Sequence, residues 1–128
     1  MIETVRYARE RNVPYLGICL GLQIAIIEYA RNVVGLSDAN STEFDKACKH
    51  PVIALVTEWT NQAGETENRD THADLGGTMR LGAQFANLEK GSICLDIYEQ
   101  QKIRERHRHR YEVNNRFIDI LEGKGLTI

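Results

Sequence analysis

One cysteine between two glycines, in the segment Gly17-Ile18-Cys19-Leu20-Gly21, constrains this sequence more than any other feature. An apolar run from Pro14 to Ile18 precedes the cysteine, and an apolar helical pattern from Leu22 to Val34 follows it. This order predicts a strand, a sharp turn and a helix, with a strained residue at the apex and glycines that leave room for the turn. The helix would aim its free N–H groups and positive dipole end at the sulfur, which favours the thiolate. The pattern therefore predicts that Cys19 is a catalytic nucleophile.

The spacing alone is a weak signal, because a cysteine between glycines can also be a small buried apolar residue. The flanking strand and helix favour the catalytic interpretation. A further helix is expected over residues 2–12, and Gly35 is expected to end the helix that follows the cysteine. Alternating helices and strands predict an α/β fold with a parallel sheet and helices on its faces.

The rest of the sequence continues this pattern. We expect a polar loop from Leu36 to His50, a short strand from Val52 to Val56, and an exposed polar connection from Thr60 to Asp74. A glycine-punctuated turn and a strand should follow from Leu75, and Gly91 to Tyr98 fits a short helix.

Residues 102–113 alternate in the manner of a strand. One face would carry Arg104, Arg106, Arg108 and Arg110, and the other would carry Glu105, His107, His109 and Tyr111. The histidines could be metal ligands, but no cysteine or carboxylate at ligand spacing completes a tetrahedral set. The arginines could bind phosphate or nucleic acid, but the interspersed glutamate and the net charge of −2 argue against it. Asn114 is expected to cap a final helix.

Composition limits the class of protein. The 128 residues suit one domain or part of one. Three cysteines without a C-x-x-C pair indicate a reducing, cytoplasmic environment. No apolar run approaches the about 18 residues of a membrane-spanning helix, and the charged N-terminus does not read as a signal peptide. We therefore expect neither a membrane nor a nucleic-acid partner.

The neighbourhood of Cys19 reads LGICLGLQ and resembles the nucleophile segment of the class I glutamine amidotransferases. Three later segments are NSTEF at Asn40–Phe44, LGGTMRLGAQ at Leu75–Gln84 and ERHRHRYEVNN at Glu105–Asn115. Together the four segments resemble the amidotransferase domain of the CTP synthase family, over nearly the whole chain. The resemblance implies a three-layer, flavodoxin-like α/β sandwich that is incomplete at both ends.

The resemblance also implies roles for particular residues. Cys19 would attack the side-chain amide of L-glutamine and form a thioester. The N–H of Leu20 would supply half of the oxyanion hole, Glu43 would bind the substrate ammonium, and Arg110 would bind its carboxylate. Without the resemblance, Glu43 would be read as a helix cap and Arg110 as part of a solvated strand face. The implied glutamine-binding residues are Leu20, Gly21, Leu22, Gln23, Glu43 and Arg110.

The sequence departs from the family pattern in what it lacks. Leu22 stands where the family usually has methionine, a swap that conserves volume. The family's catalytic base and its orienting acid lie in a His-Pro-Glu segment expected beyond Ile128, and His50-Pro51-Val52 does not replace it. The glycine-rich half of the oxyanion hole and the synthetase domain are expected before Met1. We therefore expect the 128-residue chain to lack glutaminase activity and to fold marginally.

In the complete enzyme, the resemblance implies ammonia transfer to the synthetase domain of the same chain, which aminates UTP with ATP and Mg²⁺. It implies a homotetramer in the cytoplasm, and no cofactor or metal for the present segment. Two alternatives stay open. One is another class I amidotransferase or cysteine hydrolase of the same fold, and the other is a non-catalytic, truncated gene product.

Overall fold

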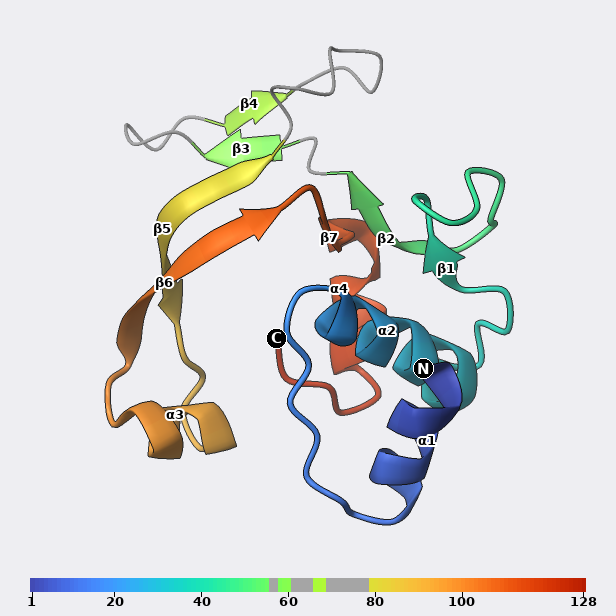
Figure 1. Ribbon diagram of the computed structural model, residues 1–128, viewed down its shortest axis with the longest axis horizontal. Coiled ribbons are helices and arrows are strands. Elements are labelled where there is room, and N and C mark those ends of the chain that lie inside the picture. Colours follow the sequence, from blue (N-terminus) through green and yellow to red (C-terminus); the bar gives the residue numbers. More distant parts are fainter. Residues whose placement is uncertain (56–57, 61–65, 69–78) are drawn as a thin grey trace.

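The computed structural model describes residues 1–55, 58–60, 66–68 and 79–128, which form a mixed α/β structure (Figure 1). Helix α1 (Ile2–Glu10) and helix α2 (Leu20–Tyr29) lie where the sequence predicted them. Helix α2 runs on into the π-helical turn η1 (Ala30–Val34), and Gly35 ends it in the left-handed conformation with φ +92°. The predicted helix and its glycine stop are therefore confirmed, with a wider last turn than expected.

Three short strands form the sheet next to α2. They are β1 (Asn40–Ser41), β2 (Pro51–Leu55) and β7 (Tyr111–Val113), in the order β1–β2–β7. Strands β1 and β2 are parallel, whereas β2 and β7 are antiparallel. Strand β7 enters the sheet from the end of a hairpin. A strand parallel to β2 would need a crossover connection, usually a helix, and β7 is not preceded by one. The α/β class is confirmed, although only one strand pair within the described ranges is parallel.

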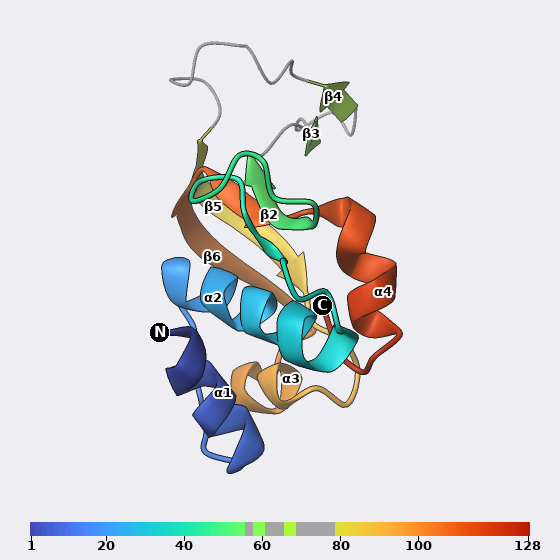
Figure 2. The same ribbon diagram turned by 90° about the vertical axis from the view of Figure 1, so that its right-hand side faces the viewer.

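The core lies between α2 and this sheet. Its buried apolar residues are Val5, Ile24, Ile26, Ile27, Ala30, Ala39, Val52, Ile53 and Leu121. Figure 2 shows α1 beside α2, with helix α4 (Ile118–Glu122) near the other end of the helical layer. Asn114 accepts a hydrogen bond from Arg116 N–H at the start of the short 3₁₀ helix η3 (Asn115–Phe117), which leads into α4. The predicted cap is therefore confirmed.

A charged pair anchors α1 to α2. The guanidinium of Arg9 donates to Glu28, with Nη2 to Oε1 at 2.8 Å and Nε to Oε2 at 3.0 Å. Asn32 Nδ2 donates to the same carboxylate at 3.0 Å. Only 1% of the Glu28 side chain is exposed, so these donors replace the water that the buried carboxylate has lost. The two helices are thus joined by polar as well as apolar contacts.

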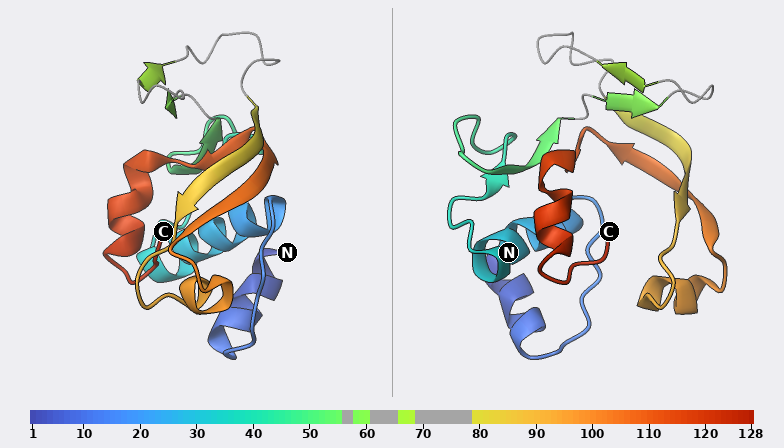
Figure 3. Two further views of the ribbon diagram at one scale, coloured as in Figure 1. Left: turned by 90° about the vertical axis from the view of Figure 1, so that its left-hand side faces the viewer. Right: turned by 180° about the vertical axis from the view of Figure 1, so that it is seen from behind.

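A two-stranded arm stands apart from this body (Figures 1 and 3). Strands β5 (Arg80–Asn87) and β6 (Lys102–His109) pair in antiparallel register along their whole length, and helix α3 (Ile93–Tyr98) lies at the far end of the arm. The predicted strand after the glycine-rich turn and the predicted short helix are confirmed. The turn at residues 75–78 lies outside the described residues.

Two small strands, β3 (Glu58–Thr60) and β4 (Thr66–Asn68), pair in antiparallel fashion. The exposed polar connection expected over residues 60–74 therefore contains β4 and the last residue of β3. Residues 61–65 and 69–74 of that expected connection lie outside the described part of the chain.

The predicted strand at Pro14–Ile18 is wrong. This segment has no regular secondary structure, and 84% of Leu16 and 74% of Ile18 is exposed. A strand exists only when a neighbour pairs with its backbone groups, and no described strand is paired with this segment. The apolar run before Cys19 is therefore present without the sheet that its sequence suggested.

Candidate active site

Cys19 occupies a sharp, strained turn between the irregular segment and α2. Its φ is +53° and its ψ is −111°, and it is the N-cap residue of α2. Such a conformation costs of order 1–3 kcal/mol for a residue with a side chain and occurs mainly at functional sites. The thiol is exposed. The strained apex predicted from the glycine spacing is therefore confirmed.

The glycines next to Cys19 permit this turn. A Cβ on Gly17 would lie 2.7 Å from the carbonyl carbon of Gly21 and 2.7 Å from the backbone nitrogen of Leu22. These are backbone atoms, so no side-chain rotation relieves the overlap. A Cβ on Gly21 would lie 3.3 Å from the hydroxyl oxygen of Tyr15. That hydroxyl donates a 3.0 Å hydrogen bond to the carbonyl of Gly21 and joins the two sides of the turn.

The start of α2 directs backbone donors towards the turn. Gln23 N–H donates to Cys19 O at 3.1 Å, and Gly21 N–H donates to Ile18 O at 3.0 Å. Leu20 is the first residue of the helix, so its N–H has no acceptor within the helix. This donor lies immediately after the cysteine in sequence, where an elbow enzyme places half of its oxyanion hole. Leu22, the next apolar side chain of this turn, is half exposed.

Gln23 connects α2 to the sheet. Its side chain is 7% exposed, and Nε2 donates to the carbonyl oxygen of Tyr111 at 3.1 Å. Its Oε1 is buried and has no hydrogen-bond partner among the described residues. A buried acceptor without a partner costs about 1–3 kcal/mol. Gln23 therefore retains an acceptor for which the described part of the chain supplies no donor.

Arg110 lies at the bend between β6 and β7 and is partly buried. Its Nε is buried and has no partner in the described part of the chain. The adjacent carbonyl of Tyr111 accepts from Gln23 Nε2 and faces His109 Nδ1 at 3.2 Å. The structure thus brings Gln23 and the bend at Arg110 together, although the two residues are far apart in sequence.

Glu43 lies in an exposed turn that follows β1. Its backbone N–H donates to the hydroxyl of Ser41 at 3.2 Å, and Ser41 is fully buried. No hydrogen bond within the described ranges joins Glu43 to Cys19, Gln23 or Arg110. The structure therefore fixes the backbone of Glu43 without joining its carboxylate to the other candidate residues.

Sequence reasoning did not identify the contribution of Tyr15 or the pairing of two histidines. His107 Nδ1 lies 2.9 Å from His109 Nε2, and burial is the main cause that lowers the pKa of His107, followed by the charge of His109. The predicted strand alternation placed both histidines on one face, which is the signal that could have found the pair. Among the described residues, no group of three or more potential metal ligands is present.

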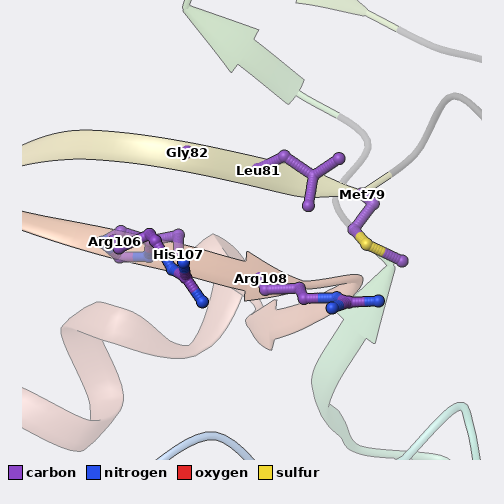
Figure 4. A pocket seen from close by; sticks show the side chains of 6 residues that line it. All are labelled: Met79, Leu81, Gly82, Arg106, His107 and Arg108. Carbon is purple, nitrogen blue, oxygen red and sulfur yellow. The ribbon is translucent and has the colours of Figure 1, made fainter.

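A pocket of about 410 Å³ lies on the arm (Figure 4). It is lined by Met79, Leu81, Gly82, Arg106, His107 and Arg108. Cys19 is not part of this lining, so the pocket is separate from the candidate nucleophile.

Within the described ranges, no helix has both the length and the apolar character needed to cross a membrane.

Comparison with known proteins agrees with this geometry. The family described as glutamine amidotransferase class-I matches residues 1–128. The glutaminase domain of CTPS from Trypanosoma brucei, solved with bound acivicin, is 39% identical and superposes with a TM-score of 0.78. That match covers 99% of this chain and 44% of the solved chain, so the present chain spans less than half of the solved chain. The chain belongs to the class I glutamine amidotransferase family and resembles the glutaminase domain of CTP synthase.

Proposed function

We propose that this chain is the nucleophile-bearing part of the glutaminase domain of a CTP synthase, with Cys19 as the nucleophile. The observation that carries the proposal is the backbone of Cys19, at φ +53° and ψ −111° on the first turn of α2. The nearby glycines are close-packed, so the strain is built into the turn. The similarity to the Trypanosoma brucei glutaminase domain supports this assignment.

The chemistry follows from the position of the sulfur. The Cys19 thiolate attacks the side-chain amide carbon of L-glutamine, and Leu20 N–H donates to the oxyanion of the tetrahedral intermediate. The C–N bond then breaks as the nitrogen takes the proton that a general base removed from the thiol. The nitrogen leaves as ammonia, and a γ-glutamyl thioester remains on the sulfur. Water hydrolyses the thioester, which releases glutamate and restores the thiol.

Two buried atoms without a partner among the described residues support an amino-acid substrate. Arg110 Nε is a charged donor suited to a carboxylate, and Gln23 Oε1 is an acceptor suited to an ammonium or amide N–H. Glu43 would pair with the substrate ammonium from its exposed turn. Gly21 and Leu22 would also contact the substrate, because they lie in the first turn of α2 beside Cys19.

The general base is proposed to come from a segment of the full-length enzyme other than these 128 residues. Within the described ranges, the hydrogen bonds of His50, His107 and His109 go to Asp38, to each other and to Tyr111, and none goes to Cys19. His72 lies outside the described residues. We therefore expect no glutaminase turnover from the 128-residue chain alone.

The remaining steps belong to the full-length enzyme. Ammonia would pass to a synthetase domain of the same chain, which uses ATP and Mg²⁺ to activate UTP for amination. We propose that this enzyme works in the cytoplasm as a homotetramer, as the resemblance to CTP synthase implies.

The test is ammonia release from L-glutamine by the full-length protein, combined with labelling by the diazoketone analogue of glutamine. Cys19→Ala should abolish both turnover and labelling, whereas Cys48→Ala and Cys94→Ala should leave both unchanged. Cys48 is a suitable control because burial raises its pKa and keeps the thiol protonated. If a simple amide analogue labelled Cys19 as well as the glutamine analogue does, the result would indicate another cysteine hydrolase. Absence of turnover in the full-length protein would indicate a non-catalytic product.

A further inference from the structure

We infer that His109 is a positioning residue for Arg110, because its ring fixes the bend that presents the arginine to the substrate carboxylate. The inference rests on the proposed glutaminase function and deepens it. His109 is the last residue of β6, Arg110 is the bend, and Tyr111 is the first residue of β7. The residues on either side of the arginine are therefore the ones that set its direction.

A hydrogen bond spans this bend. His109 Nδ1 lies 3.2 Å from the carbonyl oxygen of Tyr111, so the imidazole ring connects the two residues that flank Arg110. The same carbonyl accepts from Gln23 Nε2 at 3.1 Å. One oxygen atom thus fixes the bend and the amide of Gln23 together. Two buried atoms have no partner among the described residues, Arg110 Nε and Gln23 Oε1. Arg110 precedes Tyr111 in sequence, and Gln23 donates to the Tyr111 carbonyl.

The hydrogen-bonding chemistry sets the tautomer of each ring. A carbonyl oxygen only accepts, so His109 Nδ1 must carry the proton. In a neutral ring, His109 Nε2 is then an acceptor, and His107 Nδ1–H donates to it across 2.9 Å. The donors run in one direction, from His107 to His109 to Tyr111. His107 therefore holds the ring of His109 in the orientation that reaches the carbonyl.

Charged groups lie close to the histidine pair. Arg80, opposite His109 in the β5–β6 register, donates to Glu112 at 3.1 and 3.0 Å. Burial, His109 and Arg80 lower the pKa of His107, in that order, while Glu112 and Glu105 act in the opposite direction. The lowered pKa favours the neutral ring of His107.

Two substitutions of His109 separate the effect of its N–H donor from the effect of its side-chain volume. His109→Asn keeps an N–H donor near the place of Nδ1, so it can still reach the Tyr111 carbonyl. His109→Gln extends its amide towards the place of Nε2 and removes the donor at Nδ1. In the full-length protein with L-glutamine, we expect His109→Gln to raise KM about three- to tenfold, which corresponds to one net hydrogen bond. We expect kcat to stay within about twofold, because Cys19 is not touched. His109→Asn should retain the KM of the wild type.

The controls distinguish the inference from the function on which it rests. Wild-type glutaminase activity and its loss in Cys19→Ala test the proposed function, and Arg110→Ala tests the carboxylate contact. If these behave as proposed but His109→Gln and His109→Asn give equal KM values, the positioning role is wrong. The positioning role is also wrong if His109→Gln lowers kcat and leaves KM unchanged.

His107→Ala provides a second measurement if His109→Gln does not fold. It removes the group that orients the ring of His109, so KM for L-glutamine should rise while kcat stays within about twofold of the wild type. An unchanged KM in His107→Ala would overturn the inference.

Discussion

The hydroxyl of Tyr15 donates a 3.0 Å hydrogen bond to the carbonyl oxygen of Gly21, across the turn that carries Cys19. The bond connects the irregular segment before the cysteine to the first turn of α2 after it. The segment is not paired with any described strand. A side chain therefore stabilises, within the described residues, the conformation that strand pairing would otherwise support.

Tyr15→Phe should slow the labelling of Cys19 by the diazoketone analogue of glutamine about two- to tenfold, the effect of one net hydrogen bond. Tyr98→Phe is a matched control. Both tyrosines are 41% exposed, and Tyr98 donates a comparable 3.1 Å hydrogen bond to Glu105 on the arm. Labelling rates are read by mass spectrometry of the cysteine-containing peptide. Equal rates in the two variants would show that the bond does not support the turn.

Gly17→Ala should abolish turnover by the full-length protein and destabilise the turn, at a cost of about 1–3 kcal/mol typical of an inserted methyl group in a packed site. The added Cβ would overlap backbone atoms of Gly21 and Leu22 at 2.7 Å. Gly21→Ala should be milder, because its nearest neighbour at 3.3 Å is the hydroxyl of Tyr15, which can move. Ammonia release and urea unfolding measure both effects. The reverse order of severity would contradict this account of the turn.

Glu28→Gln should lower the free energy of unfolding by about 1–3 kcal/mol, because it removes charged hydrogen bonds from a carboxylate that is 1% exposed. The control is Glu10→Gln, which breaks the surface pair with Arg6, whose side chains are 46% and 47% exposed, and a longer contact of 3.7 Å with Arg9. Exposed pairs contribute little to stability, because water screens their charges. Urea denaturation followed by circular dichroism compares the two. A larger loss in Glu10→Gln would exclude the buried pair as the main anchor of α1.

His107 should make stability depend on pH. Its folded-state pKa lies below the ordinary value of 6.5, chiefly because the ring is buried. Between the two pKa values the unfolded state binds more protons, so the free energy of unfolding falls as the pH drops through that window. It levels off once the pH is below the folded-state pKa. His107→Asn should flatten the curve between pH about 6.5 and the lower value. Thermal melts over that range test the slope, and an unchanged slope would contradict it.

The sequence predicts the parts of the site whose geometry depends only on neighbouring residues of the chain. The turn at Cys19 requires small residues two positions before and after it, and the sequence displays both as Gly17 and Gly21. The strand at residues 14–18 was not predictable, because an apolar run indicates a strand only if a partner is present to pair with it. Local spacing contains no information about that partner.

The contacts between distant segments could not be predicted either. Gln23 and the carbonyl of Tyr111 are 88 residues apart, and a backbone acceptor leaves no mark in the sequence. The strand alternation did place His107 and His109 on one face. Their mutual hydrogen bond depends on ring orientation, which only the folded chain defines.

The π-helical turn at Ala30–Val34 bears on how sequences of this family should be aligned. A π turn accommodates one residue more than an α turn while the chain on either side keeps its direction. A relative whose helix stays α-helical to its end would therefore be one residue shorter here. The gap in such an alignment belongs inside the helix, before Gly35, and not in the loop that leads to β1.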